Sequence, residues 1–189
     1  MKLVQMPIEL LHLEQDELLA LGVDERLLAQ FKGYLSRTTD DQVGLAILAP
    51  PEAGTRELLM VLARRVGAVL RNENIRLRDA GGDLAARHKR LCYLPGSALK
   101  AALWNTVARE SLGREAACFF QDLDLTWATA PGSRDSVNPA TLVGLLDVRL
   151  QRKLPTYLSA DPGRLPPGLE REVRARVQVL EATRPDQRA

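Results

Sequence analysis

The stretch LAILAPPEAGTRELLMVLARRVG, residues 45–67, joins a short apolar run to a longer apolar segment through two prolines and a glycine. The run at 43–49 has the length and composition of a buried strand, and it ends at Pro50-Pro51. The segment at 55–70 places apolar residues at helical spacing, directly after Gly54. The stretch therefore predicts a strand, a tight turn and a helix in succession, which is the repeating unit of an α/β protein.

The same alternation of strand and helix continues along the rest of the chain. Further strands are expected at 91–94, 117–121, 154–159 and 177–180, and further helices at 7–32, 97–111, 139–151 and 168–175. Gly22 is expected to interrupt the first helix, and Asp24 and Ser97 are expected to act as N-caps. The polar segment 71–90 is expected to be an exposed hairpin or loop, and 129–138 a loop. Strands that alternate with helices predict a parallel sheet covered on both faces.

The composition limits the class of protein. With 189 residues, 46% hydrophobic content and a net charge of +2, one globular domain without an overall bias toward nucleic acid is expected. Residues 149–189 carry nine basic and five acidic side chains, which indicates either an anionic partner or ordinary solvated surface. Cys92 and Cys118 lie in apolar runs and predict buried thiols without a metal site. Because neither a signal peptide nor a membrane span is evident, we expect a cytoplasmic protein with no membrane contact.

Residues 49–56 partly match a phosphate loop. That motif, G-x-x-x-x-G-K-[ST], uses backbone N–H groups, a lysine and a hydroxyl to hold phosphates and magnesium. Gly54 matches the second glycine, but Ala49 replaces the first, Thr55 replaces the lysine and Arg56 replaces the hydroxyl residue. Glu52 adds a negative charge where phosphate oxygens would lie. The segment is therefore either a plain strand–turn–helix or a degraded phosphate loop in which Arg56 offers partial compensation.

Two further stretches favour the degraded phosphate loop. ACFFQDLDLTW, residues 117–127, is an apolar strand that ends in acids, as a Walker B strand does. KLPTYLSADPGRLPPGLEREVRARVQVLEA, residues 153–182, resembles the matching part of bacterial AAA+ replication initiators and helicase loaders, including the loader-like ATPases of insertion sequences. The resemblance implies a three-layer α/β sandwich with a mainly parallel P-loop-type sheet. It also implies an N-terminal helical segment at 1–40 packed on the core, an AAA+-like domain at 41–182, a tail at 183–189 and no C-terminal helical lid.

The resemblance also implies roles for single residues. Gln121 stands where the family has the acid that supports magnesium, so no metal site is expected. Carried over by position, the resemblance implies weak nucleotide binding by Gly54, Thr55, Arg56 and Asp161. It implies that Asp122 is a relic of a catalytic acid. It also implies that Arg176 is an arginine finger that reaches the nucleotide of a neighbouring subunit.

Three of these residues also have a purely structural interpretation. Asp122 can simply end a strand, and Asp161 can form a turn, because aspartate readily hydrogen-bonds its own backbone two residues on. Arg176 can pair on the surface with Glu170 or Glu172. Both interpretations are kept open at these positions.

Three functional hypotheses follow. The first is a catalytically degenerate adaptor or regulator in DNA replication initiation, helicase loading or recombination, which needs no cofactor. Its partner would be an AAA+ ATPase, an initiator or a replicative helicase, with weak DNA contact. The second is a weak ATP-binding protein or ATPase switch that holds ATP or ADP through Arg56. The third is a structural protein that forms homo-oligomers. Since the lysine, the hydroxyl and one acid of a hydrolysis site are missing, we expect no autonomous ATP turnover.

Overall fold

The computed structural model describes residues 15–36, 44–81, 88–128 and 137–182. Five parallel strands form one sheet in the order β2-β3-β4-β1-β5. The strands are β1 (Gly44–Leu48), β2 (Leu91–Pro95), β3 (Ala117–Gln121), β4 (Thr156–Ala160) and β5 (Gln178–Glu181). The expected parallel α/β sheet is confirmed, and β1 lies between β4 and β5.

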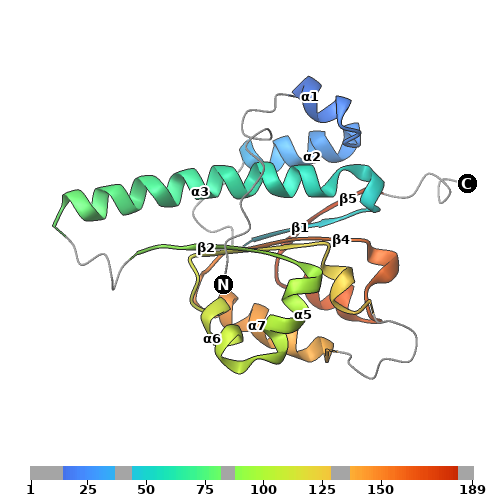
Figure 1. Ribbon diagram of the computed structural model, residues 1–189. Helices are drawn as coiled ribbons and strands as arrows, with labels where there is room; N and C mark the ends of the chain where they lie inside the picture. Colours follow the sequence, from blue (N-terminus) through green and yellow to red (C-terminus); the bar gives the residue numbers. More distant parts are fainter. Residues whose placement is uncertain (1–14, 37–43, 82–87, 129–136, 183–189) are drawn as a thin grey trace, which may run out of the picture.

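Helices cover both faces of the sheet and give three layers (Figure 1). One face carries α1 (Gln15–Ala20), α2 (Glu25–Ser36) and α3 (Thr55–Asp79), and the other carries α5 (Gly96–Trp104), α6 (Thr106–Leu112), α7 (Pro139–Gln151) and α8 (Leu169–Arg174). Short 3₁₀ turns, η2 (Pro51–Ala53), η3 (Leu123–Thr126) and η4 (Pro162–Arg164), follow the carboxyl ends of β1, β3 and β4. None of the helices in the described part of the chain has the length and apolar character needed to cross a membrane.

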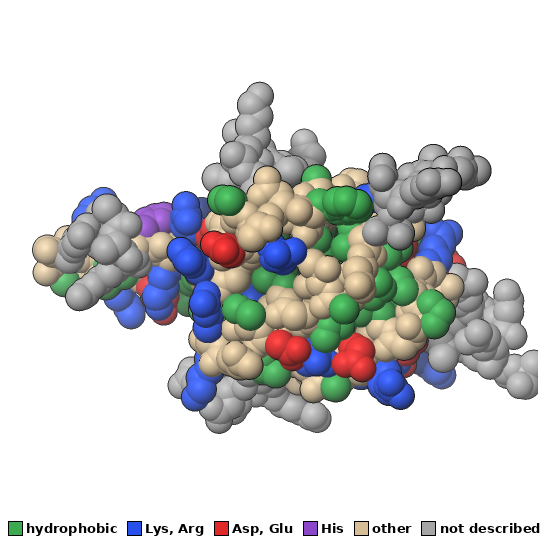
Figure 2. Space-filling model, turned by 90° about the horizontal axis from the view of Figure 1, so that it is seen from below, with side chains coloured by type: hydrophobic (Ala, Val, Ile, Leu, Met, Phe, Trp, Pro, Cys, Tyr) green, Lys and Arg blue, Asp and Glu red, His purple; other side chains and the backbone are tan. Residues whose placement is uncertain are grey.

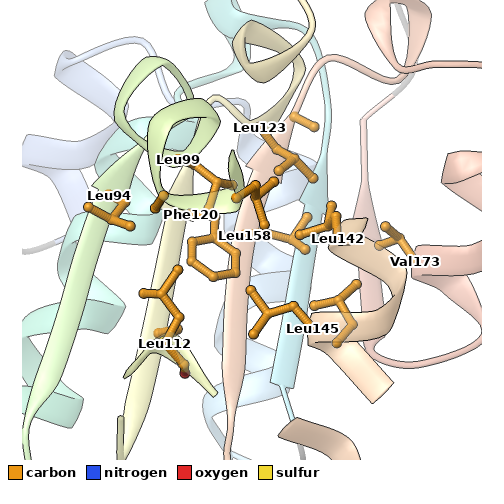
Figure 3. Packing of buried hydrophobic residues seen from close by; sticks show 14 of the residues in the cluster. Leu94, Leu99, Leu112, Phe120, Leu123, Leu142, Leu145, Leu158 and Val173 are labelled. Atoms are coloured by element: carbon orange, nitrogen blue, oxygen red, sulfur yellow. The ribbon is translucent and has the colours of Figure 1, made fainter. Parts of the chain in front are cut away.

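The hydrophobic core is divided between the two faces of the sheet. Successive residues of β1 point to opposite faces, so Leu45 and Ile47 pack with α2 and α3, whereas Ala46 and Leu48 pack on the other face. Figure 3 shows that second face, where Phe120 of β3 and Leu158 of β4 lie among leucines of the covering helices, including Leu99, Leu112, Leu142 and Leu145. Every residue of β1, β3 and β4 is buried, as a parallel sheet covered on both faces requires.

The N-terminal helices are joined to the sheet by specific contacts. Asp24 is the expected N-cap of α2, because its Oδ1 accepts a hydrogen bond from the backbone N–H of Leu27 at 2.9 Å. The side-chain amide of Gln30 donates to the backbone carbonyl of Glu181 at 3.0 Å and accepts the backbone N–H of Glu181 at 3.2 Å. Because β5 is an edge strand, these bonds satisfy polar groups that the edge would otherwise expose. The helix α2 thus covers one side of the sheet at its β5 edge.

Two expectations about the helices are wrong. Residues 71–79 continue α3 as helix, and this outer part is tied to the segment before β2. Asn74 exchanges two hydrogen bonds with the backbone of Lys89, at 2.8 and 2.9 Å, and Glu73 pairs with Lys89 at 2.8 Å. The second error concerns 97–111, which is two helices, because Asn105 ends α5 and caps α6 through the N–H of Ala108. Ser97 is not a cap, since α5 already begins at Gly96.

A fully buried arginine joins three elements on the face of α7. Arg149 has no exposed side-chain surface. Its guanidinium donates to the hydroxyl of Thr156 at 2.7 Å and to the backbone carbonyls of Leu112, Glu115 and Pro155. Burial lowers the pKa of Arg149 from its ordinary value. The side chain therefore fixes the end of α6 and the starts of β3 and β4 around α7.

Candidate functional site

The carboxyl ends of β1, β3 and β4 bring five of the predicted site residues to one edge of the sheet. The strands are neighbours, so the segments that follow them meet at this edge. Arg56, in the first turn of α3, lies 3.6 Å from the carboxylate of Asp122 after β3. The backbone N–H of Asp161, after β4, donates to Asp124 at 3.0 Å. Gly54 and Thr55 precede Arg56 directly, and only Arg176 lies elsewhere.

The loop after β1 has few groups that could hold a phosphate. Pro50 and Pro51 have no N–H, and the N–H of Ala53 already donates to the carbonyl of Pro50 at 3.0 Å. The loop closes into the 3₁₀ turn η2, and Gly54 then adopts the left-handed conformation with φ of 76°. A phosphate cradle depends on several free backbone donors that converge on the anion. This loop therefore lacks the lysine and the backbone donors at Pro50, Pro51 and Ala53, whereas the first N–H groups of α3 have no partner within the helix.

The glycine retained in the loop has a structural reason. A Cβ atom on Gly54 would lie 2.6 Å from Cγ2 and 2.7 Å from Cα of Val23, which joins α1 to α2. The backbone N–H of Asp24 donates to the carbonyl of Ala53 at 3.1 Å. The connection between α1 and α2 therefore packs directly on the turn. This contact was not predicted, because Val23 lies outside the segment that resembles a phosphate loop.

Hydrogen bonds hold the carboxylate of Asp122 in place beside Arg56. The hydroxyl of Tyr93 donates to Gln121 Oε1 at 2.8 Å, and Gln121 Nε2 donates to Asp122 Oδ2 at 2.6 Å. The backbone N–H of Asp122 donates to the hydroxyl of Ser159 at 3.0 Å. Burial raises the pKa of Tyr93, so its hydroxyl stays protonated and can donate. Gln121 thus links Tyr93 to Asp122 through its side-chain amide. By the resemblance, this is the position at which the family has its magnesium-supporting acid.

Asp122 itself has an uncommon backbone conformation. Its φ and ψ are 50° and 54°, in the left-handed region that aspartate tolerates better than most residues. The carbonyl of Asp122 approaches Gly96 so closely that a Cβ atom there would lie 2.1 Å from it. The start of α5 and the end of β3 therefore fit together only with glycine at position 96.

The two other acids at this edge are buried and bonded within the chain. Asp124 is 6% exposed and Asp161 is 2% exposed. Burial raises the pKa of Asp124 from its ordinary value, although the N–H of Asp161 that it accepts opposes this shift. Asp161 accepts the N–H of Gly163 at 2.9 Å and lies 3.4 Å from the guanidinium of Arg164. These bonds fit the turn interpretation of Asp161. No group of side chains suited to a metal ion lies among the described residues.

Arg176 lies between α7 and α8. Its guanidinium contacts both carboxylate oxygens of Asp147, at 2.6 and 3.2 Å, and Glu172 Oε2 at 2.8 Å. The surface pair with Glu172 was predicted, whereas Glu170 pairs with Arg174 instead. Asp147 was not predicted because it is 29 residues away in sequence. Arg176 holds the pKa of Asp147 below its usual range through these hydrogen bonds.

We expect Arg176→Ala to lower the free energy of unfolding by about 1–2 kcal/mol. The substitution removes the bidentate ion pair with Asp147 and the ion pair with Glu172. The matched control is Arg171→Ala, whose side chain is 86% exposed and makes one 3.9 Å contact. That control should change stability by less than about 0.5 kcal/mol. Urea unfolding measures both. Unchanged stability of Arg176→Ala, together with lost stimulation of a partner ATPase, would contradict a structural role and favour the arginine finger.

Comparisons with known proteins agree on the fold. No protein-family model and no curated protein sequence matches the chain. A DNA replication initiation factor is similar in structure, with a TM-score of 0.53 and 12% identity over 87% of this chain and 48% of its own. The DnaC helicase loader has a TM-score of 0.53 and 10% identity over 84% of this chain and 89% of its own. The replication initiator DnaA, bound to AMPPCP and single-stranded DNA, has a TM-score of 0.51 and 12% identity over 88% and 49%.

This chain has the AAA+-like fold. At this identity the likeness concerns the fold alone, and it confirms the expected P-loop-type sheet. The chain spans about half the length of the initiation factor and of DnaA. In this fold, the edge formed by β1, β3 and β4 carries the loop after β1 and the contact between Arg56 and Asp122.

Proposed function

We propose that this chain is a AAA+-like adaptor that works in DNA replication initiation, helicase loading or recombination without hydrolysing ATP. The observation that carries the proposal is the ion pair between Arg56 and Asp122 at the edge of the sheet where the loop after β1 meets the end of β3. The similarity in fold to replication initiators and a helicase loader supports the setting. The adaptor would act through contacts with an AAA+ ATPase, an initiator or a replicative helicase.

The charges at the edge support a site that no longer turns over nucleotide. Phosphoryl transfer depends on a cation that neutralises the phosphates, a magnesium ion held by hydroxyl and acid groups, and precise positioning. Arg56 is on the first turn of α3, but its guanidinium lies against Asp122, and Glu52 on the adjoining turn is exposed and negative. The second hypothesis, a nucleotide switch, requires Arg56 to leave Asp122 for a phosphate that the loop offers few N–H groups to hold.

DNA contact is proposed as a minor and non-specific contribution. The outer half of α3 extends beyond the sheet (Figure 1) and carries Arg71 and Arg76, both exposed. Basic side chains in such an arrangement contact phosphates rather than base edges. Any affinity for DNA should therefore fall steeply with salt and show no sequence preference.

The purified chain is expected to release no phosphate from magnesium ATP above the rate of an Asp122→Asn variant. The reason is that neither a phosphate-binding lysine nor the magnesium-binding hydroxyl is present. A coupled phosphate-release assay measures the rate for the unmodified chain and for Asp122→Asn.

The unmodified chain and Asp122→Asn should also form equal amounts of complex with the initiator or replicative helicase of their own cell, as measured by size-exclusion chromatography. Turnover that Asp122→Asn abolishes, or assembly that needs both Asp122 and magnesium, would show a working site.

A further inference from the structure

A groove lies between α6 and α7, on the face of the sheet opposite α3. Its volume is about 520 Å³, in the range of sites that hold one or a few side chains. Ala140 and Val148 of α7 supply exposed apolar surface, and Arg109, Arg114 and Arg152 supply three guanidinium groups. Glu110 also lines the groove and is acidic. The groove is therefore apolar within and predominantly basic in its charged groups.

The three arginines have no carboxylate partner among the residues that the structure describes. Arg109 donates to the carbonyl of Leu103 at 3.2 Å, and Arg152 donates to the carbonyl of Gly113 at 2.9 Å. These bonds position two guanidinium groups without neutralising them. Arg114 is exposed, and its side chain makes no hydrogen bond or ion pair within the described residues. Because a guanidinium fork matches a carboxylate with two parallel bonds, the groove favours carboxylates.

Gly144 gives independent support for an external ligand. It lies in the middle of α7, in an exposed position, and it lines the groove. A Cβ atom built on Gly144 would meet nothing within 4 Å, so no contact within the described chain requires glycine there. Glycine within a helix is less stable than alanine. A helical glycine that faces an open groove is explained if another chain approaches the backbone closely at this point.

Exposed apolar side chains extend the surface beyond the groove. Val107 lies one turn before Glu110 on α6 and is 77% exposed, and Trp104 at the end of α5 is 59% exposed. Figure 2 shows this side of the molecule, where hydrophobic side chains gather beside Lys and Arg. Clustered apolar surface with a charged rim is typical of a protein-binding site.

We propose that the groove between α6 and α7 docks a short acidic segment of a partner protein. One apolar side chain of the segment lies on Ala140 and Val148, and its backbone passes Gly144. The flanking carboxylates pair with Arg109, Arg114 and Arg152. A nucleic acid would use the arginines but not the aliphatic surface beside Gly144, and for this reason a peptide fits better. The proposal goes beyond the adaptor function, since it names a surface and a chemistry that do not depend on the replication setting or on the nucleotide site.

The test selects peptides of about 12 residues from a random phage library that bind the immobilised full chain. Phage that also bind a Gly144→Leu variant, whose new side chain enters the groove, are removed by counter-selection. Selected peptides are expected to carry an apolar residue flanked by Asp or Glu. Fluorescence anisotropy of one labelled peptide then compares variants. Arg114→Glu should weaken binding at least about tenfold, because like charges would then face each other.

Two variants separate binding from folding. Gly144→Leu should abolish peptide binding without lowering Tm, because a helical glycine is replaced by a better helix former in open space. Arg26→Ala, an exposed charge removed from α2 on the opposite face, should bind within about twofold of the unmodified chain. Three outcomes would overturn the proposal. They are the absence of enriched peptides, enriched peptides that bind Gly144→Leu equally well, and a labelled single-stranded oligonucleotide that binds in place of peptides and loses affinity with Arg114→Glu.

Discussion

Replacing Arg149 with leucine is expected to lower the free energy of unfolding by about 3–5 kcal/mol. The reason is that Arg149 supplies hydrogen bonds to three carbonyls and one hydroxyl at a fully buried position. Leucine fills only part of the volume and removes the donor from the carbonyl of Glu115 and the hydroxyl of Thr156, whereas the carbonyls of Leu112 and Pro155 keep bonds from Cys118. A buried acceptor without a partner is unfavourable. Urea unfolding followed by circular dichroism measures the change.

The matched control for this prediction is Arg152→Leu, three residues further along the chain. Arg152 is exposed and makes one hydrogen bond, to the carbonyl of Gly113. Its replacement should change the free energy of unfolding by less than about 1 kcal/mol. Arg149→Lys should remain strongly destabilising, because one ammonium group cannot satisfy four acceptors spread around a guanidinium plane. Equal stability of the Arg149 and Arg152 variants would contradict the role of Arg149 as a buried link.

Gly54→Ala is expected to destabilise the chain by about 2–4 kcal/mol, the sum of a strained backbone and a clash. The strain arises from the positive φ of Gly54, and the clash arises from the approach of Val23 to 2.6 Å of the new Cβ atom. If Gly54 were kept only for a phosphate, its replacement would affect ligand binding and leave the packing of α1 and α2 unchanged. Thermal and urea unfolding distinguish these cases.

Gly168→Ala isolates the contribution of strain. Gly168 also has a positive φ, of 81°, but a Cβ atom there meets nothing within 4 Å. Its replacement should therefore lower stability by only about 1 kcal/mol. The difference in the free energy of unfolding between Gly54→Ala and Gly168→Ala measures the cost of the clash between Val23 and the new Cβ atom. An equal loss for both variants would show that the connection between α1 and α2 does not press on Gly54.

Local patterns predicted most of the fold because burial and sequence agree in those elements. The helix α7 was predicted over its full length, and Pro139 occupies its first turn as expected. The structure adds that Asn138 caps it. The outer half of α3 was missed because its residues are polar and few are buried, so no apolar stripe marks the helix. Arg149 was missed because arginine is usually exposed. Its position three and seven residues after Leu146 and Leu142, on the buried face of α7, was the available signal.

The edge that carries the candidate site was predictable, but its contacts were not. Parallel strands that alternate with helices have their carboxyl ends at one edge of the sheet, and Arg56, Asp122 and Asp161 each follow such a strand. The order of the strands came from the structure. Their partners depend on geometry that no local pattern encodes. The left-handed conformation of Asp122 and the approach of Val23 to Gly54 are both long-range consequences of packing.

The binding of ATP by titration calorimetry, with and without magnesium, tests the central claim most directly. With Arg56 paired to Asp122 and the loop short of backbone donors, we predict no saturable heat up to about 1 mM ATP or ADP, in either condition. An Arg56→Ala variant should behave in the same way. The account would be contradicted by saturable, magnesium-dependent binding with a dissociation constant in the micromolar range that Arg56→Ala abolishes, since the edge would then be a working nucleotide site.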